Sequence, residues 1–293
     1  MVNIPQQLVN AIFQGSVYAL IALGYTMVFG VMRLINFAHG EIMMAGAYFG
    51  YVLCTWLNLN VFIGIIITAA ICGVLGVLLE RVAYRPLRKK GGMAVLISAV
   101  GASIFLQYLF MTIFSARPRA FSKKYDGAVY RIGENVSFSQ LKVMVLIICV
   151  AALIALAWFL KKTKQGLAMR AVACEPLAAQ VCGIDNGKIR SLCFFVGSSL
   201  AGIAGVLFGM CYTITPFMGQ APGMKAFCAA VVGGVGSIPG AVIGGYAIAV
   251  CEVAAAAFLS SAYKDAVAYV LLIVVLLIMP AGIMGLKGNS KRA

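Results

Sequence analysis

The chain has 293 residues, of which 63% are hydrophobic and only 11% are charged, and its mean hydropathy is +1.01. A soluble domain carries about 25% charged residues, so a single globular core is excluded and a membrane protein with several spans is indicated. The formal net charge of +15 does not indicate nucleic acid as a partner. The basic residues cluster between the apolar runs, where positive side chains hold cytoplasmic loops against anionic membrane lipid.

Eight apolar runs are candidate membrane spans, because a span needs about 20 apolar residues. No basic segment precedes the first run and no small-residue cleavage site accompanies it, so we interpret it as a retained span and not as a signal peptide. We expect an all-α fold of about eight transmembrane helices that forms one membrane domain over residues 1–293. The eight runs are residues 8–30, 41–57, 61–80, 93–115, 142–160, 192–214, 226–258 and 266–285.

The turn between the first two runs is unusually polar, and it contains Asn36, His39, Gly40 and Glu41. Counting the crossings places it on the inner side of the membrane. Helix capping explains much of the pattern, with Asn36 or Gly40 ending one helix and Glu41 near the positive start of the next. His39 is the single histidine and the nine cysteines include no CxxC pair, so we expect no metal ion and no other cofactor.

The basic loops predict the orientation of the chain in the membrane. Residues 81–90 carry five positive charges and are expected in the cytoplasm. Counting crossings from there places the N-terminus outside and residues 161–191 in the cytoplasm. The C-terminal tail, with Lys287, Lys291 and Arg292, is also cytoplasmic if the seventh run returns to the side from which it enters.

The loop at residues 116–141 is external by the same count, although it is basic. Two interpretations remain open. A long outer loop can be translocated regardless of its charge, or its positive charges attract an acidic external partner. The basic residues of this candidate docking loop are Arg117, Arg119, Lys123, Lys124 and Arg131.

The long cytoplasmic loop carries clear helix signals. Pro176 suits the first turn of a helix and Gly183 suits its end, which predicts a short helix at about residues 175–182. Another short helix is expected before it, at 166–173. Small helices of this kind could fit a groove on a soluble partner, or they could lie on the lipid surface.

The seventh run is too long for one straight helix and carries the sequence GGVGSIPG. Glycine flexibility and the missing proline amide break a helix there, so we expect two helical pieces that form a re-entrant hairpin. Glu252, in the second piece, is the one acid that looks truly internal; it could line a translocation path or simply hydrogen-bond between helices. The residues of the expected break are Gly233, Gly234, Gly236, Pro239 and Gly240.

The sequence lacks the phosphate-binding motif GxxxxGK[ST]. We therefore do not expect an enzyme, and energy from ATP would have to come from a partner. One internal acid is thin support for transport that is driven by protons or sodium ions.

Several stretches together resemble the permease subunits of branched-chain amino-acid ABC importers, in particular the H-type subunits of high-affinity leucine, isoleucine and valine systems. The likeness covers nearly the whole chain. The stretches are FGVMRLINFAHGEIMMAGAY at 29–48, GLAMRAVACEPLAAQVCGID at 166–185 with FFVGSSLAGIAGVLFG at 194–209, and AAVVGGVGSIPGAVIGGY at 229–246.

The resemblance implies a subunit of the bacterial inner membrane that imports branched-chain and other apolar amino acids. Its partners would be a second, homologous permease, two cytoplasmic ATPases and a periplasmic amino-acid-binding protein. The alternative is a self-contained secondary transporter or channel that uses Glu252. In the family, the loop that matches 166–185 couples the ATPases to the channel, and the positions carried over are Gly166, Arg170, Ala171, Glu175, Ala178 and Gly183.

Overall fold

The computed structural model describes residues 3–32, 34–121, 127–132 and 136–285. This described part is mostly helical, and seven of its helical segments are long and apolar enough to cross a membrane. They are α1 (Ile4–Met32), α3 (Val61–Leu79) with its continuation η2 (Glu80–Tyr84), α4 (Gly92–Phe114), α5 (Gln140–Lys162), α8 (Asn186–Cys211), α10 (Ile238–Phe258), and η5 (Ser261–Tyr263) with α11 (Lys264–Ile278).

The second expected run, residues 41–57, is not one of the seven. It corresponds to α2 (His39–Tyr51), which the π-helical turn η1 (Val52–Trp56) continues. Together α2 and η1 contain 13 and 5 residues and cover at most about 27 Å at 1.5 Å per residue, slightly less than the roughly 30 Å of a hydrocarbon core. Nearly all of α2 is buried, so it is a core helix of the bundle. Apolar content alone cannot distinguish such a helix from one that faces lipid.

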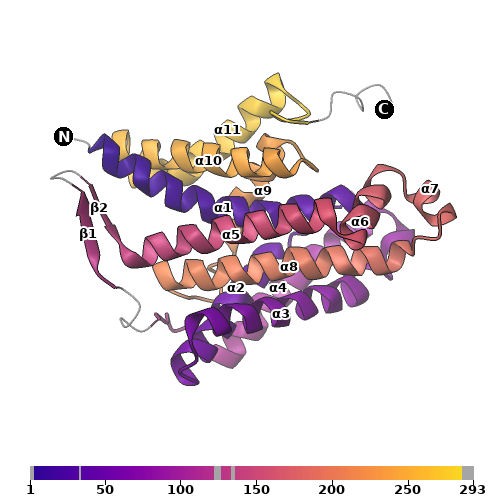
Figure 1. The fold of residues 1–293 in the computed structure, drawn as a ribbon, viewed down its shortest axis with the longest axis horizontal. Coiled ribbons are helices and arrows are strands. Elements are labelled where there is room, and N and C mark those ends of the chain that lie inside the picture. Colours follow the sequence, from indigo (N-terminus) through magenta and orange to yellow (C-terminus); the bar gives the residue numbers. More distant parts are fainter. Residues whose placement is uncertain (1–2, 33, 122–126, 133–135, 286–293) are drawn as a thin grey trace.

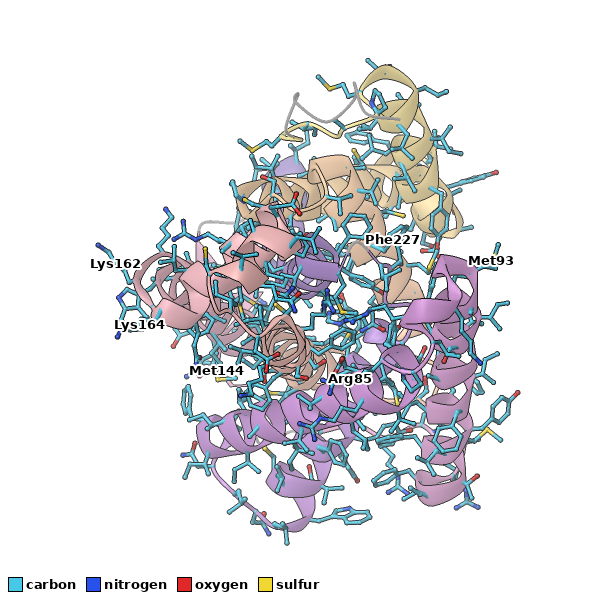
Figure 2. The ribbon with its side chains drawn as sticks, turned by 90° about the vertical axis from the view of Figure 1, so that its right-hand side faces the viewer. Arg85, Met93, Met144, Lys162, Lys164 and Phe227 are labelled. Atoms are coloured by element: carbon cyan, nitrogen blue, oxygen red, sulfur yellow. The ribbon has the colours of Figure 1, made fainter. Side chains whose placement is uncertain are left out.

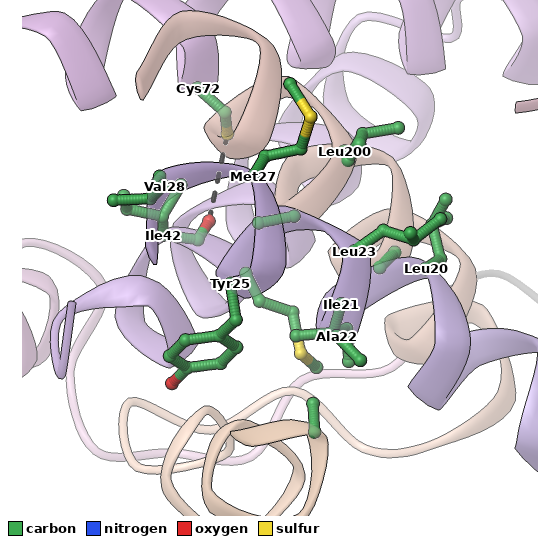
Figure 3. Packing of buried hydrophobic residues seen from close by; sticks show 14 of the residues in the cluster. Leu20, Ile21, Ala22, Leu23, Tyr25, Met27, Val28, Ile42, Cys72 and Leu200 are labelled. Atoms are coloured by element: carbon green, nitrogen blue, oxygen red, sulfur yellow. Dashed lines mark hydrogen bonds between the residues drawn. The ribbon is translucent and has the colours of Figure 1, made fainter. Parts of the chain in front are cut away.

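α1 is the central helix of the core. It is buried without a break from Gly15 to Val28, and it packs against α8 and α10. Figure 3 shows the apolar side chains of this stretch beside Ile42 of α2 and Cys72 of α3, with Cys72 Sγ 3.8 Å from the carbonyl oxygen of Ile42. Cys72 therefore acts as a small buried side chain with a weak donor.

Helix α8 packs against α2 and α3 so closely that glycines lie against the backbone of the neighbouring helix. Gly202 of α8 faces Gly46 of α2, where an added methyl group would lie 2.7 Å from the Cα atom of Gly202. Gly205, one turn further along α8, lies against the backbone of Met43. Small residues let helices approach closely, and this is how helices associate in a membrane, where lipid is as apolar as the side chains.

Large apolar side chains cover the outer faces of α4, α5 and α11. Ile97 on α4 is 64% exposed, Trp158 on α5 is 63% exposed and Leu277 on α11 is 79% exposed. A soluble monomer rarely exposes apolar patches of this extent. These faces therefore require lipid or another subunit.

The loop between α4 and α5 contains a β-hairpin that the all-α expectation missed. β1 (Val129–Ile132) pairs antiparallel with β2 (Val136–Ser139). Strands of four residues inside a polar loop show too little periodicity to predict. The side-chain oxygen of Gln6 accepts the Ser137 N–H at 2.7 Å, so the hairpin lies beside the start of α1.

Helices α6 (Lys164–Cys174) and α7 (Pro176–Val181) lie at the opposite end of the bundle from the N-terminus and the hairpin (Figure 1). They occupy the positions that the sequence predicts for two short helices. Gly183, just after α7, has φ of +82°, a left-handed conformation that favours glycine at a helix end. The opposite placement of the two loops agrees with the count of crossings, whereas the side of the membrane that each faces stays a prediction.

The seventh run, residues 226–258, is divided between α9 (Gln220–Gly233) and α10. Gly234 follows α9 with φ of +107°, which turns the chain. Ser237 Oγ accepts the N–H of Gly240 at 3.2 Å and so begins α10. The chain therefore has the two helical pieces that its glycines and proline predict, and the re-entrant path of the pair in the membrane stays a prediction. A 3₁₀ turn, η3 (Arg88–Lys90), precedes α4.

Candidate functional site

Several buried polar side chains lie in one of two clusters, and the first cluster borders a cavity of about 550 Å³ that we call the Glu41 cavity. Five helices contribute to its wall, which mixes apolar and polar side chains. The lining includes Tyr25 of α1, Glu41 of α2, Gln107 of α4, Gln220 of α9 and Tyr269 of α11.

The Glu41 carboxylate is held by α4. Its Oε1 accepts hydrogen bonds from Gln107 Nε2 at 2.7 Å and from Ser103 Oγ at 3.3 Å. Its Oε2 has no hydrogen-bond partner among the residues that the structure describes. Ser103 and Gln107 lie near the middle of the 23-residue α4, so this carboxylate lies at mid-level of a span and not at the inner surface where the count of crossings places the turn.

Asn36 shapes the turn before α2, although it does not end a helix as expected. Helix α1 already ends at Met32, and the residue before α2 is Ala38, which makes no side-chain cap. Instead, Asn36 Oδ1 accepts the Ala38 N–H at 3.1 Å and the Tyr84 hydroxyl at 2.7 Å. The expectation that Asn36 ends a helix was wrong, whereas Glu41 does lie in the first turn of α2, as expected.

His39 and Gly40 begin α2 and are buried, so Gly40 does not end a helix either. The His39 ring packs on the ring of Tyr25, with centroids 4.5 Å apart. The Gly40 backbone meets the start of α9, where a methyl group on Gly223 would lie 2.9 Å from Gly40 Cα. The starts of α2 and α9 therefore touch beside the cavity. Within the described ranges, no group of three potential ligands could hold a metal ion.

The second cluster joins four helices around Glu252 of α10. Lys225 Nζ of α9 lies 2.5 Å from Glu252 Oε1 and 2.7 Å from Asp265 Oδ1 of α11. Glu252 Oε2 accepts hydrogen bonds from Tyr18 at 2.8 Å and from Gln14 at 2.9 Å, both on α1. Glu252 is thus tied to neighbouring helices on both sides.

Sequence reasoning missed Lys225. It directly precedes the apolar run that contains Glu252, and a basic residue at that place suggests a charge at the edge of the membrane. In the structure α9 already begins at Gln220, and Lys225 is only 6% exposed. A single basic residue bordering a run that contains a single acid was the available signal for this pair.

The expected helix break is covered by the segment after α11. The backbone N–H groups of Ile283 and Met284 donate to the carbonyl oxygens of Val232 and Gly233, both at 2.9 Å. Carbonyl groups at the end of a helix lack partners within the helix. The C-terminal segment therefore completes the hydrogen bonding of α9 at the break.

The residues expected to couple to ATPases lie on α6, α7 and the turn that follows. Side-chain caps shape both helices: Thr163 Oγ1 accepts the N–H of Gly166 at 3.0 Å, and Glu175 Oε1 accepts that of Leu177 at 3.4 Å. Of the six residues, Arg170, Glu175, Ala178 and Gly183 are exposed, Ala171 is half-buried and Gly166 is buried.

Two apolar side chains project from α7. Leu177 is 73% exposed and Val181 is 89% exposed. Figure 2 looks at this end of the molecule and shows Lys162 and Lys164 at its edge. This end therefore presents a small apolar patch near positive charges.

The same end contains two fixed acidic contacts. Glu80 receives hydrogen bonds from Arg85 at 3.1 and 3.0 Å and from Ser191 at 2.9 Å. Asp185 caps α8. Its carboxyl accepts hydrogen bonds from the backbone N–H groups of Lys188 and Gly187, and these bonds hold the pKa of the carboxyl below its usual range. Both acids thus fix the geometry where the loop enters α8.

In the basic loop at the other end, some of the expected docking residues are exposed, whereas Arg119 is packed against its own chain. Arg119 packs over the rings of Tyr51 and Trp56, with its guanidinium carbon 5.8 and 5.7 Å from their centroids, and it donates to the carbonyl of Phe114 at 2.9 Å. Arg119 is therefore held by its own chain. The other expected docking residues are Arg117 and Arg131, which are exposed, and Lys123 and Lys124, which lie outside the described residues.

Comparison with known proteins shows the family to which the chain belongs. The chain matches the family model "Branched-chain amino acid transport system / permease component" over residues 7–276. It is 42% identical over 296 residues to the high-affinity branched-chain amino acid transport system permease protein LivH of Salmonella typhimurium, which covers 96% of this chain and 95% of that protein. The corresponding protein BraD of Pseudomonas aeruginosa is 40% identical over 293 residues, with the same coverage.

A solved structure shows the same general fold. PsaBC from Streptococcus pneumoniae, in complex with Fab, aligns with a TM-score of 0.51 over 93% of this chain and 91% of that chain. The two sequences are 12% identical, so the likeness concerns the arrangement of helices and not the chemistry of a site.

Proposed function

The chain belongs to the permease components of branched-chain amino acid transport systems, and we propose that it forms the membrane-spanning part of an ATP-driven importer of leucine, isoleucine, valine and other apolar amino acids. The observation that carries the proposal is 42% identity to LivH over 96% of this chain. The subunit would lie in the bacterial inner membrane and work by alternating access.

The chain would not hydrolyse ATP itself. Its relatives are permease proteins, which are transport components and not enzymes, and its sequence lacks a P-loop motif. A self-contained secondary transporter is the weaker alternative, because Lys225 neutralises Glu252 and α1 donates two hydrogen bonds to it. A carboxylate held in this way suits a link between helices better than an ion-coupling site.

One of the two cytoplasmic ATPases would dock on α6 and α7 of this chain, and the other on the second permease. The exposed Leu177 and Val181 favour a protein contact, because an isolated apolar patch gains most by burial in a groove. Gly183 fixes the direction of the chain just after this patch. Motion of a docked ATPase would thus reach α8 through a short, well-defined turn.

The remaining partners would occupy the other surfaces. A second, homologous permease would cover part of the apolar outer faces, and lipid would cover the rest. A periplasmic amino-acid-binding protein would dock at the end that carries the β-hairpin, where Arg117 and Arg131 are exposed. This assignment puts the N-terminus outside and α7 in the cytoplasm.

Reconstitution tests the proposed function. The chain is placed in proteoliposomes with its partner permease, the ATPases and the binding protein, and each component is omitted in turn. We expect uptake of labelled leucine that needs ATP and every component. Uptake by this chain alone, driven by an ion gradient, would instead favour the secondary transporter.

A further inference from the structure

Glu41 is a buried acid without a buried base beside it. The ion pairs found among the described residues involve Glu80, Asp185, Glu252 and Asp265, but not Glu41. Glu41 is nevertheless only 2% exposed. Isolated buried carboxylates are costly unless a cation or a proton compensates them.

The wall of the Glu41 cavity offers more than this charge. Phe37, Ile104 and Met224 supply apolar surface, and Gln107 holds one oxygen of Glu41 in place. A volume of about 550 Å³ lies in the usual range of small-molecule sites, about 300–1,000 Å³. An apolar wall with one fixed carboxylate matches a small ligand that has an apolar side chain and an ammonium group.

The start of α9 lies in the same wall. This 14-residue helix begins at Gln220, and Gly219 before it makes no side-chain cap. In its first turn, Gln220 donates its N–H to the carbonyl of Phe217 at 3.3 Å and Pro222 has no N–H, so it is mainly the helix dipole that makes this helix start favourable for a carboxylate. The cavity thus places the negative Glu41 of α2, held by α4, near a positive helix end on α9, a pattern that suits a zwitterion.

We propose that the Glu41 cavity binds the transported amino acid during its passage, with the Glu41 carboxylate receiving the α-ammonium group. This rests on the proposed function for the identity of the ligand. The position of Glu41 at mid-level of α4 agrees, because transport sites commonly lie near the middle of the bilayer.

Chemical protection tests the site directly. The purified complex is treated with dicyclohexylcarbodiimide, which modifies buried carboxyl groups, and adducts are located by peptide mass spectrometry. Millimolar leucine and leucinamide, which both carry the ammonium group, should lower modification of Glu41 severalfold. The acid 4-methylpentanoate, which lacks the amine, should not. Modification of Glu80 and Glu252 in the same sample is the internal control and should not change.

Uptake gives an independent test. Glu41→Gln keeps an acceptor for Gln107 and changes mainly the oxygen that has no partner here. We expect leucine uptake per ATP hydrolysed to fall about tenfold, the size of one lost charge-assisted contact. Thermal stability should not fall, because the substitution removes an unpaired buried charge and keeps the acceptor for Gln107. Glu41→Asp, which keeps the charge, should retain more uptake than Glu41→Gln.

The results separate the two proposals. Protection of Glu41 by leucinamide in a complex that does not transport leucine would support the site and contradict the proposed function. Leucine transport without protection, or with equal protection by 4-methylpentanoate, would overturn the site alone. If the reagent leaves Glu41 unmodified without ligand, the uptake ratio of Glu41→Gln decides, and an unchanged ratio overturns the proposal.

Discussion

Lys225 and Glu252 form a buried ion pair that joins α9 to α10, with Nζ and Oε1 2.5 Å apart and both side chains less than a tenth exposed. Helix α9 contains only 14 residues and ends at the glycine-rich break. Its position therefore depends on this pair near its middle and on the contacts of Ile283 and Met284 at its C-terminal end.

Lys225→Met should destabilise the protein strongly, because it leaves the Glu252 carboxylate buried without its cation. Removing one partner of a buried pair costs about 3–5 kcal/mol. The double variant Lys225→Met/Glu252→Gln should recover part of this loss. Thermal unfolding in detergent is the measurement, and a single variant as stable as the unmodified protein would contradict the role of the pair.

Gly183→Val should impair coupling while the protein still inserts into the membrane. At φ of +82°, a β-branched residue costs roughly 1–2 kcal/mol, and the turn after α7 should tilt. Uptake and ATPase stimulation by the loaded binding protein should fall together. Gln180→Val, on exposed α7 in an ordinary helical conformation, is the matched control. Equal activity of both variants would mean that the turn does not transmit motion.

Val181→Asp should weaken capture of the ATPases without loss of folding. The side chain is 89% exposed, so the substitution changes little inside the permease. Co-purification of the ATPase subunits and the melting temperature are measured together. Lys164→Asp, which changes charge at the same end but no apolar surface, serves for comparison. If ATPase capture is normal in Val181→Asp, α7 rests on lipid instead.

The basic residues of the outer loop should differ in their effects. Arg117→Ala and Arg131→Ala should slow association of the binding protein mainly at low salt, because exposed charges act on association rate and are screened over about 8–10 Å at physiological salt. Arg119→Ala should instead lower stability, because Arg119 packs over Tyr51 and Trp56. Stopped-flow binding at two ionic strengths checks this. Equal salt dependence for all three variants would show that their local contacts do not matter.

Cysteine labelling should determine the side of each end. In a cysteine-depleted background, a cysteine at Lys164 should react with membrane-impermeant reagents only from the cytoplasmic side. A cysteine at Ser137, in the hairpin, should react only from the periplasmic side. Labelling of both positions from one side would contradict the count of crossings.

The local elements of this protein are encoded within short stretches of its sequence. Apolar runs predict membrane helices because a span must bury a continuous stretch in hydrocarbon. Pro176 and Gly183 bound α7 because each constrains the backbone at its own position. The helix break between α9 and α10 is predictable for the same reason, since the glycines and the proline that cause it lie together.

Tertiary structure alone decided which polar residues meet. Glu41 meets Gln107, and Glu252 meets Lys225, only after helices have been rotated and packed against one another. No local pattern records that rotation, because an apolar helix in a membrane can turn almost any face toward its neighbours. The same packing buried α2 in the core of the bundle, which its apolar composition alone does not reveal. The sequence thus determined where most helices lie and where α7 and α9 end, whereas close packing through small residues such as Gly46 and Gly202 decided their partners.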